Sequence, residues 1–337
     1  MTTTGTTTLV ELTPAGWRWS DGLDGHRRDQ FGSPDACRRT GLPSTAYRRW
    51  KHAQTQTEWG RTHIGWLALS QSGVLLGHAT RHLLDGVLDG EPVRVYAVGD
   101  LTPSADSQQG WERTLLEHAI VDAEAGHDAA VVLLCAERAE DWQQDLGFQD
   151  VTPPESTLSF PPTRRPGAPM LSIRGGEERD LVAMAAMDDL RPPAARFHLR
   201  HDLSLFKHRL AVERMLAGLG SFGARELQFF VTEEGTIATA YVVMQVRGDE
   251  WSVLRCGDRD PTGARIGGIM QALIARDPTE PAPQISGWFP PGFVPPQAVR
   301  EATIGLPPVV LARLVGQHRH TRGVGPGESQ LWRADCV

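Results

Sequence analysis

Apolar residues in the first half of the chain follow strand-like spacing in some stretches and helix-like spacing in others. Residues 129–135, AAVVLLC, form an unbroken apolar run, which is typical of a strand buried on both faces. Residues 109–125 instead repeat apolar side chains at the spacing of an amphipathic helix. Further strands are predicted over residues 9–12, 65–69, 74–83 and 93–101, and further helices over residues 35–53 and 137–146.

The second half repeats a similar order of elements, with predicted strands over residues 170–173, 227–232, 238–247, 251–256 and from 285, and helices over residues 177–186, 203–219 and 264–275. A proline-rich stretch, TPPESTLSFPPTRRPGAP, separates the halves and predicts a linker. We therefore expect an N-terminal domain of residues 1–152, a linker of residues 153–169 and a C-terminal domain of residues 170–337. Each domain is predicted to be α/β, with a mixed sheet flanked by helices.

Composition narrows the function classes. The 337 residues carry a formal net charge of −7, which argues against a general binder of nucleic acid or membrane surfaces. No apolar run approaches the ~18–20 residues of a membrane-spanning helix, and the first residues lack the pattern of a signal peptide. Four widely separated cysteines favour reduced thiols in the cytoplasm over a disulfide framework or a zinc knuckle.

The segment of residues 93–120 is the strongest candidate for a binding site. It reads as a buried strand, a short polar turn and a helix, the arrangement that directs backbone N–H groups of a helix start toward an anion. The turn contains one glycine, Gly110, and neither Arg nor Lys precedes the helix. A carboxylate, Glu112, stands at the helix entry, so the turn has unusual chemistry for holding a phosphate.

The order and spacing of these elements resemble the Gcn5-related N-acetyltransferase superfamily, in a tandem arrangement that covers most of both halves. The matching markers are Gly99 and Thr102-Pro103 at the end of the long strand, Gly110 in the turn, Leu115-Leu116 in the helix, and Leu146-Gly147-Phe148 after the last strand. The resemblance implies that the long strand and the next buried strand splay apart. It also implies that the pantetheine arm of acetyl-CoA or another acyl-CoA lies between them.

The same resemblance implies the roles of particular residues. The cofactor would be held by Leu101, Thr102, Ser107, Gly110 and Trp111. The candidate catalytic residues are Asp100, as a general base near the end of the long strand, and Gln143, at the position where the family often has a tyrosine. A carboxylate on the solvated face of the strand is the alternative reading of Asp100. No metal site is expected.

Three positions depart from the family pattern. Ser107 stands where the family has Arg or Gln, and Glu112 stands at the second Gly/Ala position, where its charge would face a pyrophosphate of like sign. Glu112 pointing outward, where it favours the helix start, is the alternative. Gln143 can donate a hydrogen bond but cannot serve as a general acid.

The second half contains a comparable turn, GARIGG at residues 263–268, between a strand and a helix. Its glycines and Arg265 suit a phosphate better than the first turn does, but a flexible strand-to-helix connection is the favoured reading. The segment of residues 288–293, WFPPGF, is compatible either with the wall of a hydrophobic pocket or with a packing plug, and the plug is favoured.

Cysteine and histidine supply two weaker candidates. Cys135 ends the buried strand without a neighbouring histidine, which favours a structural thiol and leaves a nucleophilic hydrolase as a distant option. His78 and His82 lie too far apart along a strand to share a metal ion. His198, His201, His318 and His320 are expected to be solvated.

Together these observations predict an acyl-CoA-dependent N-acyltransferase, an acetyltransferase by preference, that acts on a small-molecule amine. The alternative is a repurposed member of the fold that performs another reaction in the old cleft or serves as a binding or scaffold protein. The departures at Ser107, Glu112 and Gln143 favour that alternative.

Overall fold

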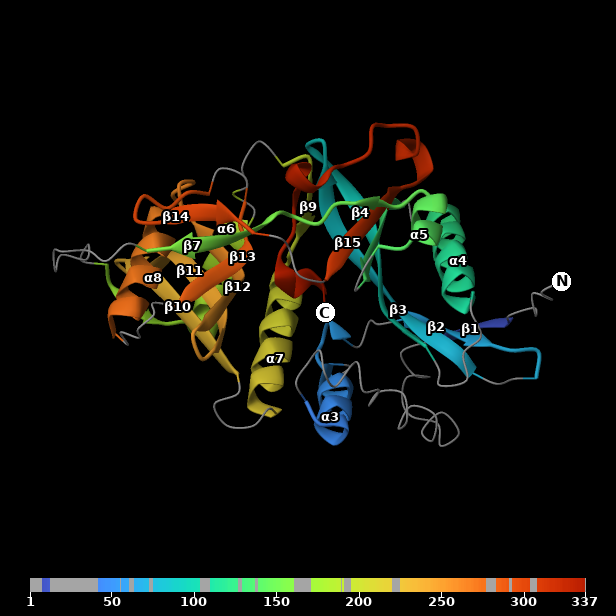
Figure 1. Ribbon diagram of the computed structural model, residues 1–337, viewed down its shortest axis with the longest axis horizontal. Coiled ribbons are helices and arrows are strands. Elements are labelled where there is room, and N and C mark those ends of the chain that lie inside the picture. The colour runs from blue at the N-terminus through green and yellow to red at the C-terminus, as the bar shows by residue number, and fades with distance from the viewer. Residues whose placement is uncertain are drawn as a thin grey trace. The chain divides into compact units, whose positions relative to one another are not determined.

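The computed structural model describes residues 8–12, 42–54, 56–60, 64–72, 75–103, 110–126, 129–136, 139–160, 171–188, 190, 195–219, 225–276, 283–290, 293–303 and 308–336. The chain forms two compact units (Figure 1). Unit 1 comprises residues 1–151, 307–325 and 336–337, and unit 2 comprises residues 152–306 and 326–335.

Unit 1 is built on a mixed sheet in which the strands follow the spatial order β1-β2-β3-β4-β5-β15-β6. The bounds are β1 (Thr8–Leu12), β2 (Ile64–Leu69), β3 (Leu75–Leu88), β4 (Glu91–Pro103), β5 (Ala129–Ala136), β15 (Val309–Leu314) and β6 (Gln149–Asp150). The neighbours β4 and β5 are parallel, and all the other neighbours are antiparallel. A parallel pair needs a crossover connection, which α4 (Trp111–Gly126) provides.

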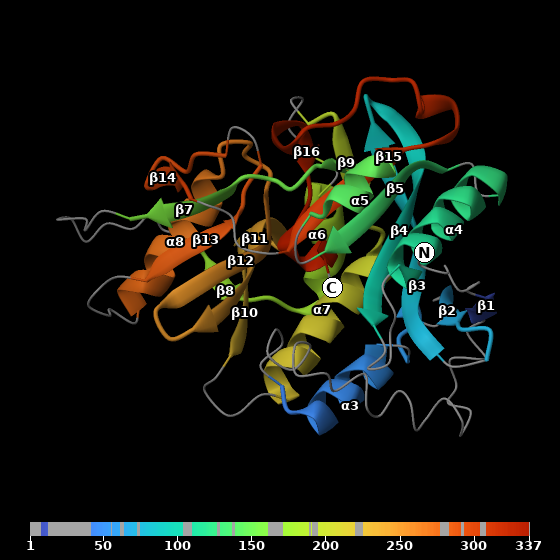
Figure 2. The ribbon, with the colours of Figure 1, turned by 45° about the vertical axis from the view of Figure 1, so that its right-hand side comes forward.

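The core of unit 1 lies between α4 and the sheet (Figure 2). Leu115, Leu116 and Ala119 of α4 pack there against Val132 and Leu134 of β5, which confirms the apolar stripe expected for this helix. Two further helices, α3 (Ser44–Gln54) and α5 (Asp141–Asp145), and the 3₁₀ turn η3 (Gly316–His318) complete the unit.

Unit 2 repeats the plan with a sheet in the order β14-β7-β13-β12-β11-β10-β8, in which β12 and β13 are the parallel pair. The bounds are β14 (Val299–Ala302), β7 (Glu155–Ser159), β13 (Gln284–Trp288), β12 (Glu250–Asp258), β11 (Ile237–Arg247), β10 (Glu226–Glu234) and β8 (Ile173–Gly175). Its helices are α6 (Leu181–Asp188), α7 (Leu203–Leu219) and α8 (Ala264–Arg276). The short elements are β9 (Phe197–Arg200), β16 (Ser329–Gln330), η2 (Glu178–Asp180), η4 (Pro326–Glu328) and η5 (Arg333–Cys336).

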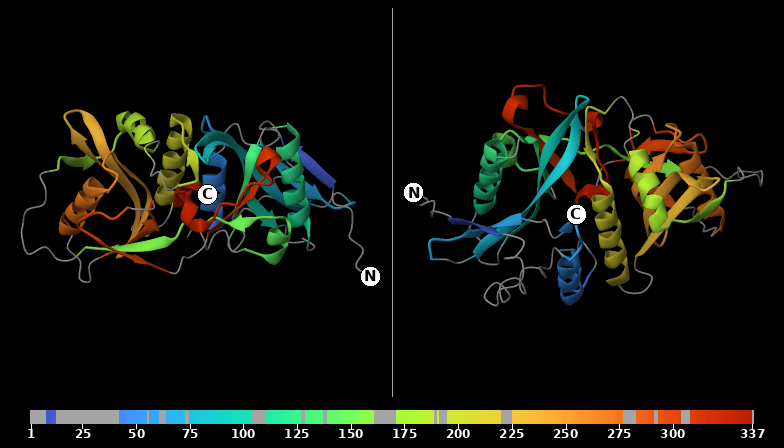
Figure 3. Two further views of the ribbon diagram at one scale, coloured as in Figure 1. Left: turned by 90° about the horizontal axis from the view of Figure 1, so that it is seen from above. Right: turned by 180° about the vertical axis from the view of Figure 1, so that it is seen from behind.

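Both faces of the sheet in unit 2 are buried under helices (Figure 3). Ala240 and Val242 of β11 contribute to the core beneath α8, whereas the intervening Tyr241 and Val243 contribute to the core beneath α6 and α7. Successive side chains of a strand point to opposite faces, so a strand covered on both sides becomes apolar throughout. The mixed α/β fold class predicted from the sequence is confirmed.

The contiguous domain boundaries expected from the sequence differ from the observed units in two places. The expected linker contains β7, which pairs with β13 and β14 in the sheet of unit 2. The expected C-terminal domain contains β15, which pairs with β5 in the sheet of unit 1. Proline-rich composition marks where a chain turns, but it does not determine which sheet edge a short strand will join. Residues 161–169 of the expected linker lie outside the described residues.

The observed elements also extend two of the predictions. β3 and β4 run on to an Asp89-Gly90 hairpin turn, where both residues have positive φ (51° and 88°), as a tight two-residue turn requires. The helix of residues 203–219 is confirmed at both ends.

In the described parts of the chain, none of the helices combines the length and the apolar character needed to cross a membrane.

Candidate functional site

The long strand β4 carries an irregularity near its end. Its pairing with β3 matches Gly99 to Thr80 and Thr102 to His78, so two residues of β4 lie opposite the single residue Ala79 of β3. Such a β-bulge bends the strand, increases its twist and changes the direction of the side chains beside it. The two residues within the bulge are Asp100 and Leu101.

The pairing between β4 and β5 stops just before this bulge. The last matched residues are Val98 and Leu134, and β4 then continues to Pro103 with β3 as its partner. β5 continues to Ala136 and pairs there with β15. Within the described chain, residues 99–103 of β4 therefore have no paired strand on the edge toward β5. A free strand edge presents backbone N–H and C=O groups that can pair with an extended, amide-containing ligand.

Gly110 lies directly before α4, and the space on its Cβ side is open among the described residues. Gly110 has φ 104°, a conformation that favours glycine, and no described atom lies within 4 Å of the point where a Cβ would stand. Its carbonyl accepts hydrogen bonds from the Thr114 amide and the Thr114 hydroxyl, both at 3.2 Å, which starts the helix. The first amides of α4 follow this glycine, as an anion site at a helix start requires.

The side chain of Glu112 interacts with backbone N–H groups at the start of α4. Its half-buried carboxylate accepts hydrogen bonds from its own backbone N–H and from that of Gly110. Burial raises the pKa of Glu112 above its ordinary value despite these donors, and the charge of Glu140 adds to the rise. The carboxylate therefore competes with any anionic ligand for the same donors.

The other predicted cofactor residues fall into two groups. The Trp111 side chain is buried in the core, with its ring against the Cα of Gly77, and Leu101 packs at the edge of the same core. Both side chains therefore contribute to the core of unit 1. For Asp100 and Thr102 the structure describes the backbone only, as part of β4. Ser107 lies outside the described residues.

Gln143 has a structural use at the start of α5. Its Oε1 accepts a hydrogen bond from the backbone N–H of Glu140 at 2.8 Å, while the Glu140 side chain accepts one from the Gln143 backbone, which forms a capping box. The side chain is 4% exposed. The marker Gly147 that follows α5 has φ 81° and ends the helix.

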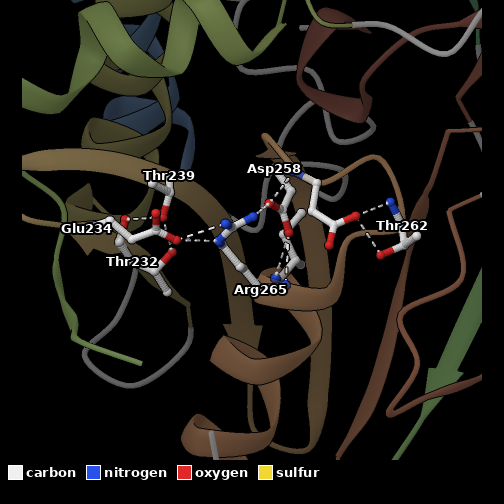
Figure 4. Close-up of polar contacts among 8 residues, drawn as sticks. Thr232, Glu234, Thr239, Asp258, Thr262 and Arg265 are labelled. Carbon is white, nitrogen blue, oxygen red and sulfur yellow. Dashed lines mark hydrogen bonds and ion pairs between the residues drawn. The ribbon is translucent and has the colours of Figure 1, made fainter. Parts of the chain in front are cut away.

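In unit 2 the side chain of Asp258 binds the amides of the corresponding turn (Figure 4). Asp258, the last residue of β12, places Oδ2 2.9 Å from the backbone nitrogen of Arg265 and 3.4 Å from that of Ile266, at the start of α8. Its Oδ1 accepts hydrogen bonds from the backbone N–H of Asp260 at 2.8 Å and from Nη1 of Arg265 at 3.2 Å. Burial raises the pKa of Asp258 even among these donors.

The glycines of this turn meet protein rather than open space. A Cβ on Gly263, which has φ 74°, would stand 2.1 Å from the ring of Phe293. A Cβ on Gly267 would stand 2.4 Å from Oε1 of Gln297. Phe293 stacks on Phe289 at 5.1 Å inside the core of unit 2, so the aromatic-proline segment acts there as packing.

One polar cluster in unit 2 escaped the sequence analysis. His201 was expected to be solvated, and this was wrong, because its side chain is 1% exposed and lies between the carboxylates of Asp188 and Asp335. Arg255 donates to Asp335 at 2.9 Å, and the Trp332 indole donates to Asp188 at 3.0 Å. These residues lie far apart in sequence, from Asp188 to Asp335, and share no motif that would have revealed the cluster.

The cysteines of the described residues form no disulfide with each other. Cys135 is partly buried and Cys256 is buried, and burial raises the pKa of Cys256 well above its ordinary value. Over the described ranges, no group of three or more His, Cys, Asp or Glu side chains is arranged to hold a metal ion.

Several solved structures share this architecture. A probable N-acyltransferase of Enterococcus faecalis, described as a conserved protein of unknown function, aligns with a TM-score of 0.61 at 10% identity, over 92% of this chain and 73% of that chain. A GCN5-related N-acetyltransferase of Kribbella flavida aligns with a TM-score of 0.58 at 13% identity, over 92% and 71% of the two chains. Another from Anabaena variabilis gives 0.57 at 9% identity, over 92% and 73%.

In sequence, no family model matches the chain and no curated protein matches it. The likeness therefore rests on three-dimensional structure, and at these identities it establishes the fold rather than the activity. Coverage of 92% of the chain means that both units take part in the likeness. The chain has the fold of the GCN5-related N-acetyltransferases.

Proposed function

We propose that unit 1 transfers an acyl group from an acyl-CoA, acetyl-CoA by preference, to the amino group of a small molecule. The observation that carries this proposal is the free edge of β4, where the ladder with β5 ends at Val98 and Leu134 while both strands continue. The amide groups of a pantetheine arm match the hydrogen-bonding groups of such an edge. The solved structures that share the fold include N-acetyltransferases, which supports the same reading.

The reaction needs positioning and one proton acceptor. The amine nitrogen forms a bond to the thioester carbonyl carbon, the carbon–sulfur bond breaks, and the CoA thiolate leaves and takes up a proton. The amine loses its own proton to Asp100 or to a water molecule beside it. Holding the two reactants at the bulge of β4 supplies most of the rate, because it converts an encounter between two molecules into a reaction within one complex.

The proposal distributes the predicted residues along the acyl-CoA. The backbone of Leu101 and Thr102 pairs with the pantetheine arm, and the amides of Gly110 and Trp111 face the pyrophosphate. Ser107, which lies outside the described residues, is assigned to the pyrophosphate from its place in the sequence alone. Gln143 is assigned a positioning role, because its Oε1 already holds the start of α5. We further propose a cytoplasmic site of action, where Cys135 and Cys256 stay reduced, and no nucleic-acid partner.

A second function is favoured by Glu112. A carboxylate that accepts the amides of Gly110 and Glu112 stands where a pyrophosphate would need those donors. Unit 1 is then a binding protein, or an enzyme that uses the slot for a ligand without phosphates. The two proposals differ in a single measurable property, the release of a free thiol from acetyl-CoA when an amine is present.

The test is an assay of free thiol release from acetyl-CoA with pooled polyamines, amino sugars and amino acids, followed by mass analysis of the acetylated product. We expect amine-dependent release, a lower kcat for Asp100→Asn and a higher KM for Gly110→Ala. Gly235→Ala is the matched control, because Gly235 also has positive φ (67°) and open space around it but lies in unit 2. Absence of release with every amine would leave the second function.

A further inference from the structure

The start of α8 in unit 2 has the hydrogen-bond donors that an anion-binding site needs. Two successive helix amides, Arg265 N–H and Ile266 N–H, converge on one oxygen, and the amide of Asp260 converges on the other. The guanidinium of Arg265 adds a fourth donor. Helix starts and turns whose backbone N–H groups converge in this way are general binding places for phosphate and carboxylate groups.

The anion at this site belongs to the chain itself. Asp258 is 2% exposed at its side chain and receives all four donors (Figure 4). We propose that the Asp258 carboxylate is a built-in ligand that occupies the anion site of unit 2 permanently, so that phosphorylated ligands are excluded from it. This inference concerns unit 2 and does not depend on the function proposed for unit 1.

The cation of the site is also fully engaged. Arg265 donates from Nη2 to Glu234 at 2.8 Å and from Nη1 to Asp258 at 3.2 Å. These carboxylates raise the pKa of Arg265 and keep its charge balanced. A phosphate arriving at the turn would have to displace two carboxylates from one guanidinium. The sequence made this turn look suited to a phosphate because of Arg265. In the structure, Arg265 is instead paired with carboxylates of the protein itself.

The space that a ligand would need is occupied as well. Phe293 touches the face of Gly263, and Pro295 and Gln297 touch the face of Gly267. Arg300 fixes this segment, because it donates to the backbone oxygens of Phe293 at 2.9 Å and of Pro290 at 3.1 Å. The absent side chains of the glycines make room for this packing, which accounts for them without any ligand.

The contrast with unit 1 supports the same conclusion. No described atom lies within 4 Å of a Cβ position on Gly110, whereas Phe293 lies 2.1 Å from the one on Gly263. Glu112 is half-buried and sits on the helix that it caps, whereas Asp258 comes from a preceding strand and is tied by Arg265. Among the described residues, the space at Gly110 is therefore open, whereas the turn of unit 2 is closed by Asp258 and by the packing of Phe293.

Chemical rescue tests the proposal directly. Asp258→Ala removes the carboxylate and leaves a space for formate, the smallest carboxylate, among the same donors. We expect Asp258→Ala to have a lower Tm than the wild type. Sodium formate should restore at least half of this decrease in Tm, whereas sodium chloride at equal concentration should not. Asp260→Ala is the matched control, because Asp260 caps Thr262 in the same turn and receives none of the helix amides; formate should not rescue it.

A second measurement uses the unaltered protein and remains informative if Asp258→Ala does not fold. Hydrogen exchange at the amides of Arg265 and Ile266 is followed in the full chain with and without inorganic pyrophosphate. We expect no change, because Asp258 already holds these amides. Protection of these amides by pyrophosphate, or equal effects of formate on the wild type and on Asp258→Ala, would overturn the proposal.

Discussion

The imidazole of His201 places Nε2 2.8 Å from Oδ1 of Asp335, two residues before the end of the 337-residue chain. The other ring nitrogen, Nδ1, lies 2.7 Å from Asp188. Each ring nitrogen therefore has a buried carboxylate within hydrogen-bond distance, and Nη2 of Arg255 lies 3.0 Å from Nε2. Burial by itself would raise the pKa of Asp335, but the charges of His201 and Arg255 hold it below its ordinary value. The cluster fastens the C-terminal segment to the core of unit 2.

We expect Asp335→Asn to destabilise the protein strongly. The substitution removes one negative charge and leaves His201 and Arg255 buried with an incomplete balance, which costs roughly 3 kcal/mol of unfolding free energy. Urea denaturation followed by tryptophan fluorescence measures the loss. Glu178→Gln is the control, because Glu178 pairs with Lys207 on the exposed surface, and we expect a change within the error of the measurement. Equal losses in both variants would contradict this account of the cluster.

The pairing of β15 with β5 predicts that the N-terminal half does not fold alone. A fragment of residues 1–152 lacks β15 and leaves β5, an apolar strand from Ala129 to Ala136, as an unprotected sheet edge. We expect this fragment to aggregate, and a peptide of residues 307–325 to restore a soluble complex with native-like circular dichroism. A scrambled peptide of the same composition is the control. A folded, monomeric fragment without the peptide would show that β15 is dispensable.

Glu213 on α7 predicts a pH-dependent stability. Burial raises the pKa of its carboxyl from 4.5 to about 7, against the opposing charge of Arg209. Because the folded state holds the proton of Glu213 more tightly than the unfolded state does, the free energy of unfolding is highest below pH 4.5. It falls as the pH rises toward 7. Glu213→Gln should therefore gain on the order of 3 kcal/mol over the wild type at pH 8 and nothing at pH 4.

The measurement for Glu213 is the difference in urea-unfolding free energy between variant and wild type, taken at several pH values. Glu226→Gln, which alters an exposed residue at the start of β10, reports the effect of removing a surface carboxylate. A difference for Glu213→Gln that does not grow with pH would show that the carboxyl is not buried as described.

Much of the fold was accessible from the sequence because its periodic elements are long. The apolar run of β5, the amphipathic α4 and the helix Leu203–Leu219 carry their own pattern, so each was placed within a few residues. The short strands β6, β7, β14 and β15 have too few residues to display a period. Their membership in a sheet depends on which edge is free, a tertiary property that a local pattern does not contain.

The candidate site was accessible to a smaller degree. The markers around Gly110 identified the turn of unit 1, because a strand, a glycine and a helix in that order have one geometry. The same reasoning missed that Asp258 closes the turn of unit 2, since an acidic residue at a strand end has many other uses. His201 was missed because its partners, Asp188 and Asp335, lie far apart in sequence. Charge pairing of buried residues becomes visible only when the chain is folded.

Glu112 predicts a pH dependence of acyl-CoA affinity. Its pKa is raised, so it takes up a proton at a higher pH than an ordinary glutamate, and protonation removes its repulsion toward the pyrophosphate. We expect the Kd for acetyl-CoA to fall as the pH is lowered. Glu112→Gln should bind about tenfold more tightly at neutral pH, which corresponds to roughly 1.4 kcal/mol.

The Glu112 comparison contains its own control. Any titration of acetyl-CoA itself affects both proteins equally, so the ratio of the two Kd values isolates the carboxylate. The ratio should approach one at low pH. A ratio that stays constant across the pH range would show that Glu112 does not face the ligand.

The most direct test of the central claim is a calorimetric titration of the full-length chain with acetyl-CoA. The free edge of β4 and the open turn at Gly110 predict binding in the micromolar range with one site per chain, because Asp258 closes the turn of unit 2. The same stoichiometry should hold for Glu112→Gln with a lower Kd. Absence of binding heat at millimolar acetyl-CoA, in both the wild type and Glu112→Gln, would contradict the assignment of unit 1 as an acyl-CoA site.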